Sequence, residues 1–349
     1  MPAKRILIDL STLRHPMCGL GQIALNYGRW YQKHAQELSD RLDITLLVPK
    51  NYIGAFGDEV HYLKRNTLRR LFPITMPRYD IWHAITQATT FRPKSRSTRF
   101  ILTIHDVNFL HEKNNGKQNK YRRKLQHLCD LATEYTFISQ FAQEDTSRVI
   151  NLYNKPSRII YNAVEELTHG TQEEPSQLAA LDKPFFLTIG EVKEKKNIHT
   201  LLPMMERFPD CHLIIAGNDS TEYAAHLRAK TANNPRIHII GIVSDSQRRW
   251  LYSHCQALLF PSVAEGFGLP LIEAMQWGKP VFCSDKTSLP EIGGPYAHYF
   301  TNFDPQHMAE VVERGLTAFT KEKAAAEQAY AATFSYEKHM RNYVDLYLL

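Results

Sequence analysis

Cysteine is scarce in this sequence, and the five cysteines that are present lie far apart. They are Cys18, Cys129, Cys211, Cys255 and Cys283. An odd number at such wide spacing forms neither a disulfide framework nor a zinc-binding pattern, so we expect a reducing compartment and no structural metal. Long apolar runs are missing too, because none approaches the roughly 18–20 residues that a membrane-spanning helix requires.

Other targeting and binding signals are also absent. Residues 1–5 lead directly into a predicted strand, without a secretory apolar region or a small-residue cleavage site, so we expect a cytoplasmic protein. The segment Gly278-Lys279-Pro280 does not end a P-loop, because neither Ser nor Thr follows the lysine. Helix-turn-helix, zinc-finger and RNP signatures are missing, and we therefore expect no nucleic acid partner.

The chain is long and has an uneven excess of positive charge. Its 349 residues are enough for two domains, each with its own core, and the formal net charge is +6. Basic residues concentrate in the first half, over 65–99 and 117–124. Such runs are usual on solvated surfaces, but they also suit an anionic partner, either a phospholipid surface or a lipid-diphosphate acceptor.

Short apolar runs alternate with helix-forming segments, which favours parallel sheets covered by helices on both faces. We predict strands over 5–10, 43–49, 79–84, 98–104, 134–139, 158–164, 185–190, 211–217, 236–241 and 257–260. We predict helices over 22–34, 120–132, 197–207, 223–232, 244–253, 305–320, 321–333 and 335–349, and a polar loop over 112–120. A polar stretch in the middle reads as a linker. The expected domains are therefore 1–165 and 184–334, with a linker over 166–183 and a terminal helix over 335–349.

The most informative stretch is 260–275, where a strand, a tight loop and a helix start follow one another. Gly266 and Gly268 form the loop, and a helix start attracts phosphate through its unpaired N–H groups and its dipole. Glu265 and Glu273 flank this loop, and a carboxylate can accept two hydrogen bonds from vicinal hydroxyls of a sugar. The pattern predicts a sugar nucleotide as ligand. The simpler alternative is a surface loop before a helix with an acidic first turn.

The segment 265–275, together with Gly278-Lys279-Pro280-Val281 and 289–294 (LPEIGG), closely resembles the donor-binding block of the retaining GT-B glycosyltransferases of glycosyltransferase family 4. The resemblance implies an α/β fold of two Rossmann-like domains with parallel sheets facing across a cleft. The second domain would hold the nucleotide-sugar donor and the first most of the acceptor site. No Asp-x-Asp motif supplies the ligands of GT-A enzymes, so we expect metal-independent transfer without a cofactor.

The same resemblance implies roles for individual residues on the donor side. Glu265 should hold hydroxyls of the donor sugar, Glu273 the ribose, and Lys196 the departing diphosphate, on which negative charge builds up. Further expected donor contacts are Gly19, Gly21, Gly190, Lys195, Ile242, Val243, Gly266, Phe267, Gly268 and Leu269. Glu191 departs from the family pattern, because many members have an arginine there, so Lys195 takes over that role or phosphate neutralisation is weaker.

On the acceptor side, His105 ends a predicted strand at the edge where open sheets bind ligands. The pair His105-Asp106 resembles the family motif whose histidine lies near the transferred sugar, so His105 joins Glu265 and Lys196 as a candidate catalytic residue. Asp106 would orient His105 or its loop. His83 and Ser139 are weaker acceptor-side candidates, since a core histidine and a helix cap explain them equally well.

The function that follows is that of a retaining hexosyltransferase acting on a nucleotide sugar. GDP-mannose is the favoured donor because the His-Asp and Lys-Asn motifs resemble those of mannosyltransferases. The acceptor would be a glycan or a lipid-linked glycan of surface polysaccharide or lipopolysaccharide, with the enzyme cytoplasmic or peripheral on the inner face of the membrane. Two alternatives remain open, namely a sugar-nucleotide epimerase of the same fold and a non-catalytic sugar-nucleotide binder.

Overall fold

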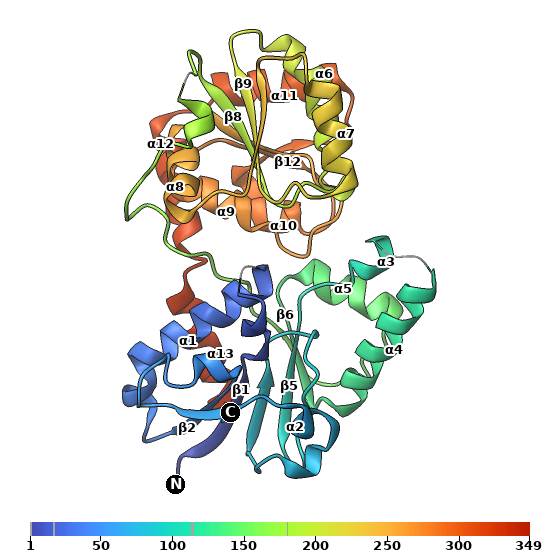
Figure 1. The fold of residues 1–349 in the computed structure, drawn as a ribbon, viewed down its shortest axis with the longest axis vertical. Helices are drawn as coiled ribbons and strands as arrows, with labels where there is room; N and C mark the ends of the chain where they lie inside the picture. Colours follow the sequence, from blue (N-terminus) through green and yellow to red (C-terminus); the bar gives the residue numbers. More distant parts are fainter. Residues whose placement is uncertain (1, 17, 113–114, 180) are drawn as a thin grey trace. The chain divides into compact units, whose positions relative to one another are not determined.

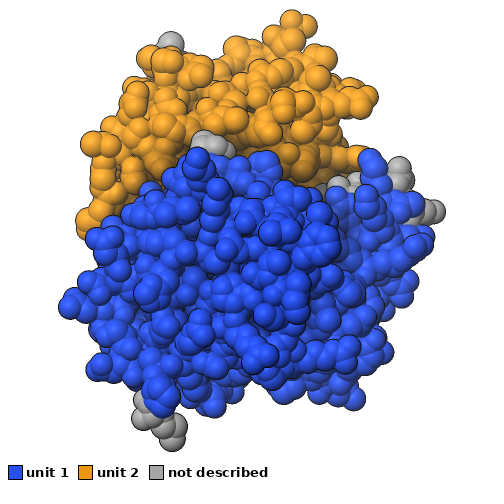
Figure 2. Space-filling model, turned by 60° about the horizontal axis from the view of Figure 1, so that its bottom comes forward, with its two compact units in different colours: residues 1–161, 336–349 blue, residues 162–335 orange. Residues whose placement is uncertain are grey.

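The computed structural model describes residues 2–16, 18–112, 115–179 and 181–349, and the chain forms two compact units. Unit 1 comprises Met1–Tyr161 and Tyr336–Leu349, and unit 2 comprises Asn162–Ser335 (Figure 2). The segment 166–183, expected as a linker, is grouped with unit 2. There Leu167 is fully buried, and its N–H donates to Gln276 Oε1 at 3.1 Å.

Unit 1 is built on a seven-stranded parallel sheet with the order β3-β2-β1-β4-β5-β6-β7 (Figure 1). Its strands are β1 (Lys4–Asp9), β2 (Leu42–Val48), β3 (His61–Lys64), β4 (Ile81–Ala84), β5 (Arg99–Ile104), β6 (Glu134–Phe137) and β7 (Ser157–Ile159). Its helices are α1 (Gly19–Leu38), α2 (Thr67–Leu71), α3 (Phe109–Glu112), α4 (Asn115–Leu131), α5 (Gln140–Val149) and α13 (Tyr336–Leu348), with short 3-10 turns η1 (Ser11–Arg14), η2 (Lys50–Tyr52) and η3 (Pro73–Thr75).

Strands β1, β2, β4 and β5 of this sheet are largely apolar on both faces, as expected for a buried parallel sheet. In β1, Ile6 and Ile8 belong to one apolar cluster, whereas Leu7 belongs to the other. Helices α1 and α13 contribute to the first cluster and lie side by side, and α4 contributes Leu125 and Leu128 to the second. The sheet therefore has a helical layer on each face.

Helix α13 is held in unit 1 by polar contacts as well as apolar ones. His339 Nε2 lies 2.8 Å from the Tyr27 hydroxyl, and Tyr343 OH lies 3.1 Å from Thr103 Oγ1. All four side chains are buried. Hydrogen-bonded hydroxyls and rings in the core fix the position of the helix more specifically than apolar packing alone, because an unpaired buried polar group would be costly.

Unit 2 is built on a six-stranded parallel sheet with the order β10-β9-β8-β11-β12-β13. Its strands are β8 (Phe185–Ile189), β9 (His212–Ala216), β10 (Ile237–Gly241), β11 (Ala257–Phe260), β12 (Val281–Ser284) and β13 (His298–Phe300). Its helices are α6 (Leu201–Met204), α7 (Glu222–Thr231), α8 (Asp245–His254), α9 (Leu269–Gln276), α10 (Leu289–Gly293), α11 (Pro305–Thr317) and α12 (Lys321–Ala332), with 3-10 turns η4 (Ser176–Leu178), η5 (Glu194–Lys196), η6 (Ile198–Thr200), η7 (Met205–Arg207) and η8 (Gly294–Tyr296).

Both sheets have the doubly wound order of Rossmann-like domains, which confirms the predicted α/β class with two such domains. The strand order reverses between β1 and β4 in unit 1 and between β8 and β11 in unit 2. Open α/β sheets bind ligands outside the carboxyl ends of the strands at such a switch point. Ligand sites are therefore expected at these two points.

Two local expectations were wrong, and three strands were missed. The polar loop expected over 112–120 is largely helical, because α4 begins at Asn115 and buries an apolar face farther along; residues 113–114 lie outside the described part of the chain. The helix expected over 197–207 is broken into 3-10 turns and the short α6, since Asn197 has a left-handed backbone (φ 55°) and Pro203 has no N–H. The strands β3, β12 and β13 were not predicted.

Candidate functional site

The switch point of unit 2 is formed by the segments that follow β8 and β11. Gly190 comes directly after β8, with φ at 138°, and Gly217 comes directly after β9, with φ at 135°. A Cβ on Gly217 would lie 1.9 Å from the carbonyl oxygen of Gly190, so only glycine allows the two backbones to approach this closely. The tight turn after Gly190 leads into η5, which carries Lys196.

Lys196 and Glu265 meet at this point. Their Nζ and Oε1 atoms lie 2.5 Å apart, and the two side chains are 14% and 13% exposed. Ser262 Oγ donates to the same carboxylate oxygen at 2.6 Å, and the ammonium group of Lys196 lies 4.7 Å from the centre of the Phe260 ring. The structure thus brings a cation and an acidic acceptor together at the carboxyl edge of the sheet, with little solvent around either.

The loop that carries Glu265 is held by residues that follow the next strand of the sheet, β12. The N–H of Glu265 donates to Thr287 Oγ1 at 3.1 Å. Ser288 Oγ lies 3.1 Å from the carbonyl oxygen of Glu265 and 2.9 Å from that of Phe267. Sequence reasoning missed Ser262, Thr287 and Ser288. Ser262 could have been noticed within the same loop, but nothing in the sequence shows that the segment after β12 contacts this loop.

The glycine loop ends at α9. Gly268 is the N-cap residue of α9 and has φ at 112°, and no side chain caps this helix start. A Cβ on Gly268 would lie 2.7 Å from Leu289 Cδ2, so this position also requires glycine. Gly266 and Phe267 are buried, and Leu269 is the first residue of the helix. These residues stand where the sequence predicts a phosphate-attracting turn.

Glu273 lies one turn into α9 and is nearly buried. One carboxylate oxygen accepts a hydrogen bond from the Tyr252 hydroxyl at 2.7 Å, and the other lies 3.5 Å from Arg248 Nη1. Burial, together with the adjacent Glu273 carboxylate, holds the pKa of Tyr252 well above its usual value, so the phenol stays protonated and donates. Tyr252 and Arg248 lie on α8, and sequence reasoning did not select either of them.

The remaining donor-side candidates of unit 2 lie near the same edge. Ile242 and Val243 directly follow β10, and the side chain of Ile242 is 71% exposed, which is unusual for isoleucine. The carbonyl oxygen of Lys195 accepts from Val263 N at 2.8 Å, so this residue fastens the turn after β8 to the glycine loop. Glu191 forms an ion pair with Lys193 at 2.8 Å.

In unit 1, His105 directly follows β5 and is nearly buried. The ring Nε2–H of His105 donates to the carbonyl oxygen of Ile85 at 2.8 Å, and its backbone N–H donates to Gln87 Oε1 at 2.9 Å. Burial lowers the pKa of His105, so the ring is neutral at pH 7 and Nδ1 is left as an acceptor. Asp106 Oδ1 accepts from Asn108 N at 3.0 Å, which fits its expected role of shaping the loop.

The other two acceptor-side candidates have structural partners. His83 is fully buried, and its two ring nitrogens lie 2.6 Å from Tyr347 OH and 2.8 Å from Thr103 Oγ1. It therefore presents no free ring nitrogen to a substrate, and we leave it out of the proposed site. Ser139 is also fully buried and caps α5 by accepting from Ala142 N at 3.0 Å.

Gly19 and Gly21, expected near the donor phosphates, lie in the first turn of α1 in unit 1. Only Gly21 requires glycine for packing, because a Cβ there would lie 2.1 Å from the carbonyl oxygen of His15. A Cβ on Gly19 would meet nothing within 4 Å. Gly21 thus lets the segment before α1 fold against the helix, and the phosphate role of both residues stays a prediction.

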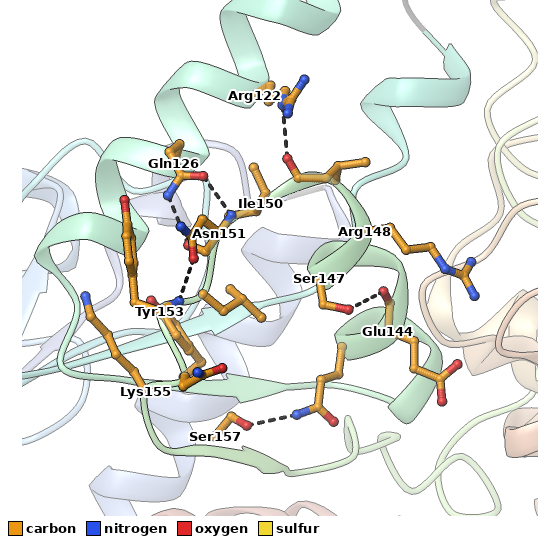
Figure 3. Close-up of a pocket in the computed structure, with 15 residues that line it drawn as sticks. Arg122, Gln126, Glu144, Ser147, Arg148, Ile150, Asn151, Tyr153, Lys155 and Ser157 are labelled. Atoms are coloured by element: carbon orange, nitrogen blue, oxygen red, sulfur yellow. Dashed lines mark hydrogen bonds between the residues drawn. The ribbon is translucent and has the colours of Figure 1, made fainter.

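A cavity of about 730 Å³ lies in unit 1, away from the predicted site residues (Figure 3). It is lined by the end of α5 and by the segment leading into β7, so it faces the amino edge of the sheet, opposite to the switch point. Its polar groups are largely bonded already: Arg122 Nε donates to Val149 O, and Lys155 Nζ donates to three carbonyl oxygens near the end of α4. None of the predicted site residues lines it.

Among the described residues, no group of three or more His, Cys, Asp or Glu side chains is placed to hold a metal ion. Within the same part of the chain, no helix is both long enough and apolar enough to cross a membrane.

Comparison with known proteins gives a consistent result. The family described as "Glycosyl transferases group 1" matches residues 171–332. The O-antigen chain mannosyltransferase B of Escherichia coli is 26% identical over 328 residues, covering 83% of this chain and 84% of the relative. The O-antigen chain mannosyltransferase RfbU of Salmonella typhimurium is 26% identical over 303 residues, covering 80% and 82%.

Solved structures show the same fold at low sequence identity. Sucrose-phosphate synthase from Thermosynechococcus elongatus superposes with a TM-score of 0.72 at 17% identity, over 99% of this chain and 98% of that one. HepE from Anabaena, in complex with UDP-glucose, gives 0.71 at 19% identity, over 99% and 100%. The family match over residues 171–332, the relatives and the two Rossmann-like sheets agree, and together they support a group 1 glycosyltransferase with the GT-B fold, and hence a hexosyltransferase.

Proposed function

We propose that this enzyme transfers mannose from GDP-mannose, with retention of anomeric configuration and without a metal ion, to a glycan or lipid-linked acceptor during assembly of a surface polysaccharide or lipopolysaccharide. Two relatives that align with at least 80% of this chain are named as O-antigen chain mannosyltransferases, which supports the choice of sugar and pathway. The donor is a substrate, and no cofactor takes part.

The observation that carries the proposal is the pair formed by Lys196 and Glu265 at the switch point of unit 2. When the donor binds, hydroxyls of its sugar would donate to Glu265, and the ammonium group of Lys196 would turn to the diphosphate. As the glycosidic bond breaks, negative charge develops on the leaving diphosphate, and a preplaced cation with little solvent around it stabilises that charge strongly. The N–H groups at the start of α9 would add to this stabilisation.

The nucleoside would occupy the neighbouring part of the same edge. Glu273, already oriented by Tyr252, would accept hydrogen bonds from the ribose hydroxyls. The exposed side chain of Ile242 would pack against the base, which gives a reason for its exposure.

On the acceptor side, His105 is the residue we assign to the region of the transferred sugar. Its Nδ1 lone pair can accept a hydrogen bond from a hydroxyl group, because Nε2–H is committed to Ile85. No side chain is assigned as a nucleophile. A front-face reaction, in which the leaving phosphate helps to deprotonate the acceptor hydroxyl, is compatible with this set of groups.

We also propose that the enzyme works at an anionic membrane surface, with the segment 68–74 of unit 1 as its contact. Four apolar side chains are more than half exposed there, namely Leu68, Leu71, Phe72 and Ile74. Arginines flank them at 65, 69, 70 and 78, and the interval 64–79 contains no acidic residue. Exposed apolar side chains among cations suit the interface of a bilayer that carries anionic lipids.

A donor screen tests the proposed function. Thermal unfolding is measured with GDP-, UDP-, ADP- and TDP-sugars, and GDP-mannose should raise the midpoint most, because a ligand at about 100 times its Kd adds about 2.7 kcal/mol. Transfer is then followed with and without acceptor and with a chelator, and the anomer of the product is identified by NMR. Conversion of the donor without acceptor would identify an epimerase, and binding without any turnover would identify a non-catalytic binder.

A further inference from the structure

A small cavity lies at the switch point of unit 1, at the carboxyl edge of its sheet. Its volume is about 110 Å³, room for several water molecules or one group of phosphate size. It is lined by residues that follow β1 (Ser11, Thr12, Arg14), the residue that follows β3 (Arg65) and residues that follow β4 (Ala88, Thr90), together with His15, Cys18 and Leu20. Segments after three strands of the sheet, β1, β3 and β4, thus converge where open α/β sheets bind ligands.

The two arginines that line this cavity have no carboxylate at ion-pair distance in the described part of the chain. The Nε of Arg65 is buried and bonded to no described group. Such a donor is costly to leave unpaired inside a protein, more so when it belongs to a charged group. Arg65 also stacks on the Phe91 ring at 5.7 Å, which keeps its guanidinium at the cavity wall.

Other cations add to the positive potential around the cavity. Burial and the nearby Arg14 and Arg70 lower the pKa of Arg65. Burial, Arg14 and Lys120 likewise lower the pKa of Lys124, so these charges repel one another. An anion placed among them would remove this repulsion.

Asp9 is the acidic side chain that partly offsets this charge. Its carboxylate attracts Arg65 electrostatically, but both of its oxygens accept hydrogen bonds within the fold. Asp9 accepts from the N–H of Ser11 at 2.9 Å and from the Thr89 hydroxyl, and so ties the segment after β1 to the segment after β4. It shapes the cavity but does not neutralise the two arginines at its wall.

We propose that this cavity binds a phosphate or diphosphate group of the acceptor, held by Arg14 and Arg65. The inference rests on the proposed function, and it narrows the acceptor to a phosphorylated carrier rather than a free glycan. Guanidinium groups suit the task because their N–H donors match phosphate oxygens in pairs. The donor diphosphate is assigned to Lys196 in unit 2, and we assign the anion held by the arginines to the second substrate. Contact of the neighbouring Gly19 and Gly21 with the donor phosphates stays a separate prediction, and titration with GDP distinguishes the two.

Calorimetric titration tests the proposal with three probes: inorganic diphosphate, farnesyl diphosphate and GDP. The variants are Arg14→Gln, which removes an exposed side chain, and Arg65→Lys, which keeps the charge but not the paired donors. Arg78→Gln is the matched control, because this exposed arginine does not line the cavity. Unfolding midpoints of all variants confirm that the chain is folded.

We expect Arg14→Gln and Arg65→Lys to lower the affinity for inorganic diphosphate and for farnesyl diphosphate about tenfold or more. Arg78→Gln should change these affinities less than about twofold. GDP affinity should be unchanged in all three variants. Equal diphosphate affinity in wild type, Arg14→Gln and Arg65→Lys would overturn the site. A loss of GDP affinity equal to the loss of farnesyl diphosphate affinity would overturn the assignment to the acceptor, since the cavity would then hold the donor.

The two proposals fail separately. If no nucleotide sugar binds but the affinity for farnesyl diphosphate still depends on Arg14, the proposed function is wrong and the anion site stands. If mannose is transferred equally well by wild type and Arg14→Gln to a phosphate-free acceptor and to a diphosphate-linked one, the anion site is wrong and the function stands.

Discussion

The ammonium group of Lys196 lies 2.5 Å from a carboxylate oxygen of Glu265, although the two residues are 69 positions apart in the sequence. Each is the partner of the other before substrate binds, so the donor must separate or bridge the pair. The pairing explains how both side chains can be poorly solvated without a large desolvation penalty, since a paired charge costs far less to bury than a lone one.

The pair predicts that stability and activity respond differently to substitution. Lys196→Met should reduce kcat about 100- to 1000-fold and also destabilise unit 2, because the Glu265 carboxylate is left without its cation. Adding Glu265→Gln should restore most of the stability but none of the activity. Urea unfolding and turnover with GDP-mannose measure the two effects. Lys193→Gln is the control, and an equal loss of activity there would show that any lost charge in this turn suffices.

Glu273 predicts a specific dependence on the ribose. Wild type should bind GDP about tenfold more tightly than its 2′- or 3′-deoxy analogues, whereas Glu273→Gln should bind GDP more weakly and discriminate little among them. Tyr252→Phe should raise the KM for the donor with a smaller change in kcat, because it removes the hydroxyl that orients the carboxylate. Full discrimination by Glu273→Gln in calorimetry would remove the ribose assignment.

The segment 68–74 predicts binding to anionic vesicles. The test uses vesicles that contain about 30% phosphatidylglycerol. Replacing Leu71, Phe72 and Ile74 together by serine should lower the partition coefficient of the protein on these vesicles by about tenfold or more. Ile53→Ser, at another exposed apolar site of unit 1, serves as the control. Binding should weaken with added salt. Cosedimentation that ignores both salt and the triple substitution would contradict a contact through this segment.

Acid should weaken the attachment of α13. Burial lowers the pKa of His339 to about 4, and its Nδ1–H donates to the carbonyl oxygen of Tyr161 at 2.6 Å. Because the unfolded state binds the proton more tightly, the stabilisation is complete above about pH 6.5 and is lost as the pH falls toward 4, by up to about 3 kcal/mol. Hydrogen exchange of peptides from 336–348, corrected for intrinsic rates, should accelerate over this range. Constant protection from pH 7 to 4.5 would contradict it.

Glu327 predicts the opposite trend in unit 2. This carboxyl on α12 is nearly buried, its Oε2 has no described hydrogen-bond partner, and burial raises its pKa to about 8. The folded state therefore binds the proton more tightly, and stability falls as the pH rises from about 4.5 to 8, by a few kcal/mol at most. Glu327→Gln should raise the unfolding midpoint at pH 8 and leave it nearly unchanged at pH 5. Glu322→Gln, at an exposed site on the same helix, is the control.

Much of the fold could be read from the chain because its signals are local. The apolar runs that became β1, β5 and β8 are continuous and short, as buried parallel strands require, and the glycine loop before α9 combines positive φ at Gly268 with a helix start. The strands that escaped prediction lie toward the sheet edges or directly after a turn. Their few residues, such as β13 with His298–Phe300, carry too little periodicity to be recognised.

The sequence by itself determined the two alternating α/β halves, the sugar-nucleotide motif and the candidates Glu265, Glu273 and Lys196, because each depends on neighbouring residues. Only the tertiary structure decided which of these groups touch. In the folded protein Lys196 pairs with Glu265, Tyr252 donates a hydrogen bond to Glu273, and His83 lies in the core. Such pairings depend on strand order, and strand order is fixed by the packing of whole sheets and helices rather than by any local run of residues.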